Sequence, residues 1–230
     1  MSRATSPLPA RAVLFDLDGT LADTAPDLAH VLNLQLSARG RPQLPVHALR
    51  PHVSHGARGM LRTGFGLGPD DAGYAALRDE FLDLYEQNLC RDTRLFPGMP
   101  ELLAALEQRG TAWGIVTNKM ERFTLPLMQA LGLAARAGCI IGGDTTGRAK
   151  PHPDPLLEAS RRLGIDPREC AYVGDDERDV QAGHAAGMTP VVALYGYLGE
   201  DKPPHQWGAA LYIEQPLDLL KLLPQPPSMG

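Results

Sequence analysis

Two patterns of apolar and polar residues alternate along most of the chain. Short apolar runs are typical of buried strands, and the stretches between them have apolar residues three or four positions apart, as amphipathic helices do. Strands that alternate with helices in this way indicate βαβ units, and thus an α/β, Rossmann-like parallel sheet with helices on both faces. The predicted strands are residues 12–17, 112–117, 139–142, 170–174 and 190–194, with a weaker one at 210–213.

Two of the helices have recognisable ends. The stretch 99–110 has Pro100 in its first turn and Gly110 at its end, and the stretch 154–164 ends in the same way at Gly164. Proline is tolerated at the start of a helix and glycine favours its end. These signals predict one helix in each stretch.

Residues 24–92 interrupt the alternation with three helical patterns, near 24–39, 53–64 and 73–90. Thr24 and Asp27 could form a capping box at the first of them. An all-helical block after the first strand predicts a small helical cap domain inserted into the core. We expect the cap at 23–92, the sheet-based core at 11–22 and 93–222, and disordered tails at 1–10 and 223–230.

The composition agrees with this organisation and excludes some functions. A chain of 230 residues with 43% hydrophobic and 21% charged residues is typical of a globular protein, and a net charge of −5 argues against a nucleic-acid partner. The three cysteines form no C-x-x-C pair, which favours reduced thiols in the cytoplasm. No apolar run suits a signal peptide or a membrane span, and the sequence makes no prediction about oligomeric state.

One stretch has the opposite charge. Residues 28–69 contain five arginines and four histidines but no acidic residue. Two interpretations are open: a solvated basic face, or attraction of an anionic ligand.

Polar residues follow the apolar strands where a parallel sheet would gather them. Asp16 and Asp18 end the first strand, Thr117 and Asn118 end the second, and the run GDDERD at 174–179 ends the fourth, while Lys150 precedes a helix. Carboxyl ends of parallel strands form the ligand crevice of such sheets, so Asp175 and either Asp176 or Asp179 should approach Asp16 and Asp18. Two like charges 4 Å apart repel by ~4 kcal/mol near a protein surface. A cation is therefore required, and oxygen ligands favour Mg²⁺.

A metal-bound carboxylate beside a second carboxylate suits phosphoryl transfer, with one as nucleophile and the other as acid and base. Thr117, backbone N–H groups and Lys150 would hold the phosphoryl oxygens. Each piece alone has a structural explanation: Thr117 or Asn118 as a helix N-cap, GDDERD as helix capping, Lys150 as a surface lysine. Their common position at strand ends favours the chemical interpretation.

The motifs DLDGT, VTN, a lysine before Pro151, and GDDERD resemble those of haloacid-dehalogenase-like phosphatases from about residue 11 to 220. The resemblance implies Asp16 as nucleophile and Asp18 as acid and base. It also implies Mg²⁺ held by Asp16, the Asp18 carbonyl and Asp175. It further implies that Thr117, Asn118 and Lys150 surround the phosphate, and that Asp179 supports the site from behind the metal ligands. In relatives of this family the position of Asp176 is often Ser or Thr. We expect Asp176, like Asp179, to support the metal ligands without binding the metal itself.

Within the family the chain resembles phosphoglycolate phosphatases, and several stretches, such as YGYLGEDKPPHQWGA, resemble N-acetylmuramic acid 6-phosphate phosphatases. We expect hydrolysis of a small carboxylate-bearing phosphorylated metabolite, first of all 2-phosphoglycolate, with N-acetylmuramic acid 6-phosphate as the alternative. His55 and Arg58 of the cap stretch VSHGARGM should contact the substrate, with Arg58 on its carboxylate. A phosphomutase and, in another class, a phospho-accepting signalling domain are the rival functions.

Overall fold

The core is a six-stranded parallel sheet with the strand order β5-β4-β1-β6-β7-β8. The computed structural model describes residue 8, residues 10–200 and residues 202–224. All six predicted strands are present, with ends within two residues of the prediction. They are β1 Ala12–Phe15, β4 Ala112–Val116, β5 Cys139–Ile141, β6 Cys170–Gly174, β7 Thr189–Ala193 and β8 Leu211–Ile213.

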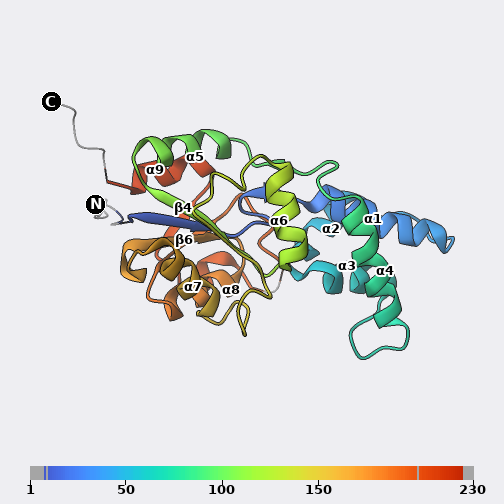
Figure 1. Ribbon diagram of the computed structural model, residues 1–230. Helices are drawn as coiled ribbons and strands as arrows, with labels where there is room; N and C mark the ends of the chain where they lie inside the picture. The colour runs from blue at the N-terminus through green and yellow to red at the C-terminus, as the bar shows by residue number, and fades with distance from the viewer. Residues whose placement is uncertain (1–7, 9, 201, 225–230) are drawn as a thin grey trace.

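Helices cover both faces of this sheet, as Figure 1 shows. Val13 and Phe15 of β1 point to the face that packs against α5, α6 and α9, whereas Ala12 and Leu14 point to the face covered by α7 and α8. Strands buried on both faces need apolar residues at every position, which explains the continuous apolar runs in the sequence. The helices are α5 Met99–Gln108, α6 Glu121–Ala130, α7 Asp154–Leu163, α8 Glu177–Ala185 and α9 Leu219–Leu222.

The strand order changes direction at β1. The chain goes from β1 to β4 and β5 on one side, and then crosses to β6, β7 and β8 on the other. A crevice forms beyond the carboxyl ends of the strands at such a point. The residues that follow β1, β4 and β6 therefore meet there.

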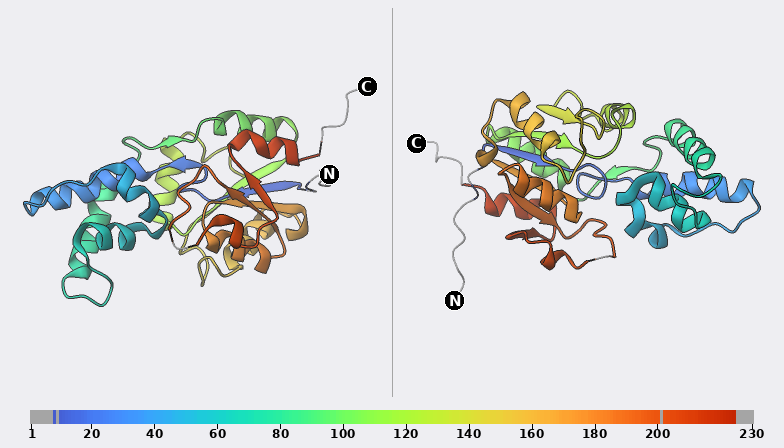
Figure 2. Two further views of the ribbon diagram at one scale, coloured as in Figure 1. Left: turned by 180° about the vertical axis from the view of Figure 1, so that it is seen from behind. Right: turned by 90° about the horizontal axis from the view of Figure 1, so that it is seen from below.

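The cap is a second lobe with its own apolar core, which Figure 2 shows beside the sheet. Leu32, Met60 and Phe81 are among its fully buried side chains. An antiparallel ribbon of β2 and β3, close to the proposed boundaries at residues 23 and 92, joins this lobe to the core. The elements are β2 Ala22–Asp23, α1 Ala25–Ala38, α2 Val46–Leu49, the 3₁₀ helix η1 Arg50–His55, α3 Gly56–Phe65, α4 Tyr74–Gln87 and β3 Arg94–Leu95. The inserted helical cap is thereby confirmed.

Several local predictions were wrong or incomplete. Thr24 and Asp27 form no capping box, because Thr24 donates its hydroxyl to Asp18 and the Asp27 carboxylate accepts from Thr93. The helix expected at 53–64 begins within η1, and α6, with Pro126 inside it, was not anticipated. Short 3₁₀ helices were missed as well: η2 Pro167–Glu169, η3 Pro204–Gln206 and η4 Pro216–Asp218.

The expected disordered tails lie mostly outside the described residues, which omit 1–7, 9 and 225–230. Leu8 and Leu223, which we expected in the tails, are instead buried. The Leu8 N–H also donates to the Leu222 carbonyl. These contacts attach Leu8 and Leu223 to the core.

The arginines of the basic stretch 28–69 have different surroundings. Arg50 forms a two-pronged ion pair with Asp23, with N–O distances of 2.9 and 2.8 Å, and Arg39 pairs with Glu80. Arg39 and Arg41 also lie against the Phe65 ring. Acidic residues from outside the stretch thus neutralise part of its charge.

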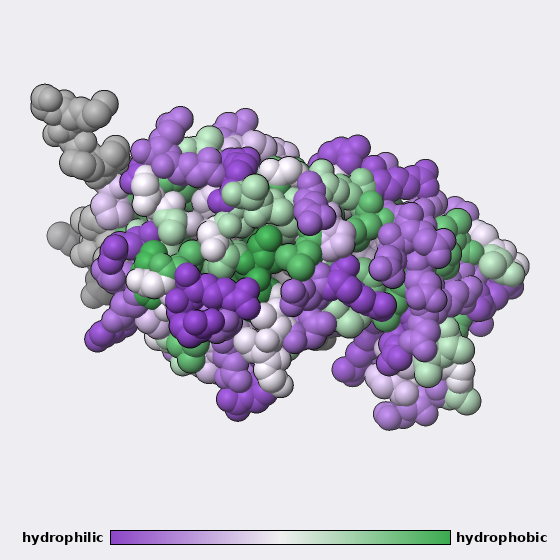
Figure 3. Space-filling view, in the orientation of Figure 1, coloured by the Kyte–Doolittle hydropathy of each residue, from purple (hydrophilic) through white to green (hydrophobic). Residues whose placement is uncertain are grey.

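Hydrophilic residues spread over both lobes on the face seen in Figure 3, with hydrophobic residues interspersed. None of the helices in the described part of the chain has both the length and the apolar character needed to cross a membrane. Cys90, Cys139 and Cys170 are free thiols, as expected.

Candidate active site

Asp16 and Lys150 meet at the carboxyl end of the central strand. The Lys150 Nζ lies 2.9 Å from Asp16 Oδ1 and 2.7 Å from Asp179 Oδ1, and also donates to the Tyr172 hydroxyl. Asn118 holds the Lys150 main chain from both sides, because its side-chain amide donates to the Lys150 carbonyl and accepts from the Lys150 N–H. Lys150 is therefore a buried, fixed cation and not a surface lysine.

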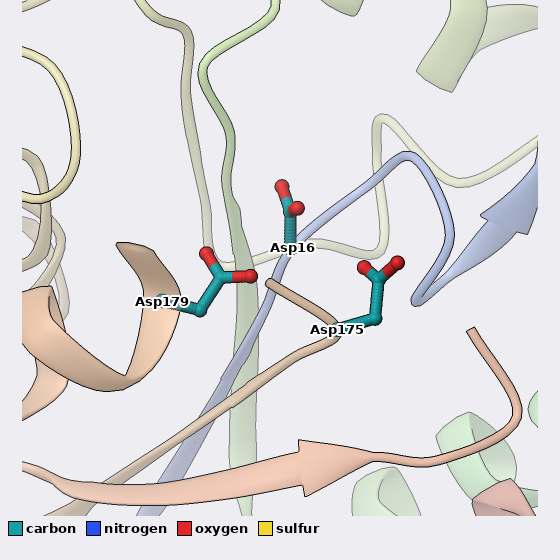
Figure 4. Close-up of side chains that lie close together, drawn as sticks. All are labelled: Asp16, Asp175 and Asp179. Carbon is teal, nitrogen blue, oxygen red and sulfur yellow. The ribbon is translucent and has the colours of Figure 1, made fainter. Parts of the chain in front are cut away.

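Three carboxylates gather around this point, as Figure 4 shows. Asp16 follows β1, Asp175 follows β6 and Asp179 lies in the first turn of α8; one oxygen of each lies within 4.8 Å of the others. Burial, partly offset by Lys150, raises the pKa of Asp16 to about 7. Burial and the charges of Asp16 and Asp179 also raise the pKa of Asp175 well above its usual value. Asp16 and Asp175 therefore hold protons more tightly than usual unless a cation lies beside them.

Charges in and around this cluster do not balance. The carboxylates of Asp16 and Asp179 share Lys150, that of Asp18 pairs with Lys119, and that of Asp176 pairs with Arg178. Asp175 instead accepts hydrogen bonds from the Thr20 hydroxyl and the Tyr197 N–H. Five carboxylates thus face three cations, and the difference is the charge of one divalent ion.

Asp18 lies outside the acidic cluster. Its Oδ1 accepts hydrogen bonds from the Lys119 Nζ, at 2.7 Å, and from the Thr24 hydroxyl. Burial alone would lower the pKa of Lys119, but the Asp18 carboxylate and Tyr85 together outweigh it and raise that pKa above its usual value. Lys119 is therefore charged, and both contacts leave Oδ2 of Asp18 as the oxygen available for proton exchange.

Asp176 and Asp179 also fix the start of α8. Asp176 accepts from the Arg178 N–H, and Asp179 accepts from the Asp176 N–H, which makes the reciprocal capping box that the motif permits. The Arg178 guanidinium binds the Asp176 carboxylate and donates to the Ser54 carbonyl of the cap at 2.8 Å. Arg178 is thus a direct connection between the core and the cap.

A cavity of 460 Å³ lies between the cap and the ends of the strands. The core contributes the predicted Asp16, Asp18, Thr117, Asn118 and Lys150 to its wall, along with Asp176 and Asp179. The cap contributes His55 and Arg58, together with an apolar wall that includes Phe81 and Tyr85. Residues far apart in the sequence therefore surround one space, which is large enough for a metabolite. Asp175 lies behind this wall.

Tyr197 links the acidic cluster to the segment where the cap begins. Its N–H donates to Asp175, and its hydroxyl accepts from the N–H groups of Thr24 and Ala25 and donates to Asp23. The Arg50 guanidinium lies over its ring. The tyrosine thus contacts both the metal-ligand candidate Asp175 and the start of the cap.

Sequence reasoning missed four residues of this site: Lys119, Tyr85, Arg178 and Tyr197. Lys119 directly follows Thr117 and Asn118, so its position after the strand was the available signal. Arg178 lies inside the GDDERD run, where only the acidic residues were considered. No sequence signal identifies Tyr85 or Tyr197, which come from a cap helix and a late loop.

Acidic residues and lysines at the carboxyl ends of a Rossmann-like sheet, under an inserted helical cap, define a class of hydrolytic enzymes. The chain belongs to the haloacid dehalogenase-like hydrolase family, whose model matches residues 13–193. This membership confirms the resemblance found in the motifs, and it favours an enzyme over a phospho-accepting signalling domain.

Known relatives are similar over nearly the whole chain. A phosphoglycolate phosphatase of Xanthomonas campestris pv. campestris is 49% identical over 91% of this chain and 94% of its own length. An N-acetylmuramic acid 6-phosphate phosphatase of Pseudomonas putida is 43% identical over 93% of this chain and 96% of its own. The crystal structure of a predicted phosphoglycolate phosphatase from Haemophilus somnus 129PT has a TM-score of 0.81 at 28% identity, covering 93% of this chain and 98% of that one.

Proposed function

We propose that this protein is a Mg²⁺-dependent phosphomonoesterase of the cytoplasm that acts through an aspartyl-phosphate on a small carboxylate-bearing phosphorylated metabolite. The observation that carries the proposal is the placement of Asp16, Asp18 and Lys150 on the wall of one cavity, with the acidic cluster beside them. Each group has a chemical task that its contacts suit.

Asp16 is the nucleophile in this proposal. Its Oδ1 accepts from Lys150 and from the Leu17 N–H, so Oδ2 is the oxygen free to attack phosphorus. Lys150 balances charge as phosphate approaches, and Thr117 lies on the same wall. The Asn118 amide already binds the main chain of Lys150, so its part in phosphate binding is to place that lysine.

Asp18 is the acid and base. Its free Oδ2 gives a proton to the leaving oxygen, and the resulting carboxylate takes a proton from the water that hydrolyses the aspartyl-phosphate. Lys119 and Thr24 hold the other oxygen, so the carboxyl group keeps one orientation in both steps.

Mg²⁺ fits the acidic cluster by the chemistry of its donors. Asp16, Asp175 and Asp179 offer carboxylate oxygens, and the surrounding charges leave a deficit of two positive charges. The Asp18 carbonyl is a further candidate ligand, and Asp176 supports the cluster through the start of α8. When bound, the ion would neutralise the negative charge that crowds Asp16 and the phosphate.

Our first candidate substrate is 2-phosphoglycolate, in line with the name of the Xanthomonas relative. The cavity volume of 460 Å³ also leaves room for the second candidate, N-acetylmuramic acid 6-phosphate, which is far bulkier. Both substrates carry a carboxylate, and His55 and Arg58 are the cap residues that we expect to contact the part beyond the phosphate.

Phosphate release from both candidates and from an aryl phosphate tests the proposal. We expect activity that needs Mg²⁺ and disappears in Asp16→Asn, because an amide is a poor nucleophile and a weaker metal ligand. Asp70→Asn, on an exposed loop of the cap, is the matched control and should behave as the wild type. Full activity in excess chelator, or in Asp16→Asn, would overturn the mechanism. The ratio of kcat/KM values for the two metabolites decides between them.

A further inference from the structure

The Tyr85 hydroxyl is a buried polar group with no regular partner. Tyr85 lies in α4 of the cap and is 2% exposed, with its ring edge packed on Phe123. Among the described residues no hydrogen bond of regular geometry reaches this hydroxyl, although the Lys119 ammonium lies near it. A buried hydroxyl without a partner is costly and calls for a physical explanation. Tyr85 lines the cavity, so a bound molecule can supply the missing acceptor.

The Lys119 ammonium has hydrogen-bonding capacity left as well. Its side chain is 9% exposed, and its Nζ lies 4.8 Å from the centre of the Tyr85 ring. An ammonium carries three N–H donors, and in the described part of the chain only the Asp18 carboxylate accepts one with regular geometry. Lys119 therefore presents further donors to the same side of the cavity as Tyr85.

The position of this pair defines what it can bind. Lys119 Nζ is 2.7 Å from the carboxylate that we propose protonates the leaving oxygen. A substrate group held by Lys119 must therefore be attached close to the ester oxygen. An ammonium and a neutral hydroxyl together are donors for an anionic oxygen, and a carboxylate has two such oxygens.

We propose that Lys119 and Tyr85 recognise a carboxylate attached directly to the carbon that bears the phosphate ester, as in a phosphorylated 2-hydroxy acid. This inference rests on the proposed phosphatase function. It differs from the expectation that Arg58 takes the carboxylate. It also distinguishes the two candidate substrates, because 2-phosphoglycolate carries its carboxylate at that position whereas N-acetylmuramic acid 6-phosphate carries it on the far side of the sugar ring.

The test compares three substrates in Tyr85→Phe, which removes the hydroxyl but keeps the ring and leaves Asp18 untouched. The substrates are 2-phosphoglycolate, 2-hydroxyethyl phosphate (which lacks the carboxylate) and N-acetylmuramic acid 6-phosphate. We expect kcat/KM for 2-phosphoglycolate to fall about tenfold or more, the loss of one hydrogen bond to a charged group. The value for 2-hydroxyethyl phosphate should stay within about twofold. Tyr212→Phe is the matched control, since its hydroxyl donates to the Ala209 carbonyl in the core.

Lys119→Met is the companion variant. It disturbs Asp18 and should lower kcat on every substrate, but the additional loss in kcat/KM should again be confined to 2-phosphoglycolate. Arg58→Ala should not reproduce this selectivity. Unfolding temperatures of the variants check that each one is folded, and that of Tyr85→Phe should equal or exceed the wild-type value because no buried hydroxyl is left unpaired.

Each other outcome contradicts the inference. An equal loss on all three substrates in Tyr85→Phe would mean that the hydroxyl acts on Asp18 or on the cap. No loss on 2-phosphoglycolate, a selective loss in Arg58→Ala instead, or a wild type that does not prefer 2-phosphoglycolate to 2-hydroxyethyl phosphate would also overturn it. If the wild type hydrolyses none of the three esters and no aryl phosphate, the proposed function itself fails.

Discussion

Removing the charge of Asp16 should make the metal-free protein more stable, although it removes the proposed nucleophile. Burial displaces the pKa of Asp16 from 3.8 to about 7. At ~1.4 kcal/mol per pH unit, this displacement corresponds to ~4 kcal/mol against the folded state with Asp16 ionised. In Asp16→Asn the amide can keep the hydrogen bond from the Leu17 N–H but weakens the one from Lys150. We therefore expect a gain of ~2–4 kcal/mol in the free energy of unfolding at pH 8.

The sign of the pH dependence follows from the same displacement. The folded state holds the Asp16 proton more tightly than the unfolded state does, so protonation stabilises the fold. This contribution is fully present below pH 3.8 and is lost as the pH rises through about 7. The advantage of Asp16→Asn over the wild type should therefore shrink to less than about half when the pH falls from 8 to 5. The raised pKa of Asp175 also makes the stability of the metal-free protein fall as the pH rises, in the wild type and in Asp16→Asn alike.

Urea unfolding in the presence of a chelator, at pH 5 and pH 8, measures this difference. Asp70→Asn is the control for loss of an exposed carboxylate. Added Mg²⁺ should stabilise the wild type, because binding to the folded state alone raises its stability, and should stabilise Asp16→Asn much less. The reasoning is refuted if Asp16→Asn is no more stable than the wild type at pH 8, or if its advantage is the same at both pH values.

Two further predictions concern the acid and base, and the core. Asp18→Asn should slow turnover by ~10²–10⁴ and should slow both formation and hydrolysis of the aspartyl-phosphate in single-turnover experiments; wild-type turnover would exclude Asp18 from the mechanism. Leu14→Ala, on the fully buried central strand, should lower the free energy of unfolding by ~2–5 kcal/mol. Leu217→Ala, at an exposed position, should change it far less, and equal effects in urea unfolding would contradict the assigned core.

Much of the fold was predictable because the sheet is buried on both faces. Such strands must be apolar throughout, so β1 and β6 stand out as continuous runs that end at polar residues. The cap was predictable from its helical patterns. The ribbon of β2 and β3 was not, since strands of two residues have no periodicity to detect. Helix α6 was missed because Pro126 within its pattern normally signals an interruption.

The site was predictable as a set of residues but not as a set of contacts. Strand ends and motifs indicated Asp16, Asp18, Asp175 and Lys150, and these do meet at one edge of the sheet. Which carboxylate oxygen faces which cation depends on the directions of the side chains. The spacing of residues along the sequence does not determine these directions. The sequence could not show that the Asp18 carboxylate binds Lys119 while Asp16 and Asp179 share Lys150.

The contacts of Tyr197 connect the acidic cluster to the segment where the cap begins. One residue donates its N–H to Asp175 and binds the first turn of the cap with its hydroxyl. We expect a ligand that changes how Asp175 is held to alter the contacts of Tyr197 with the cap, and with them the position of the cap. Linkage is reciprocal. If binding of an ion favours one position of the cap, that position raises the affinity for the ion by the same free energy. If the acidic cluster binds the proposed Mg²⁺, the affinity for the ion should therefore depend on the position of the cap.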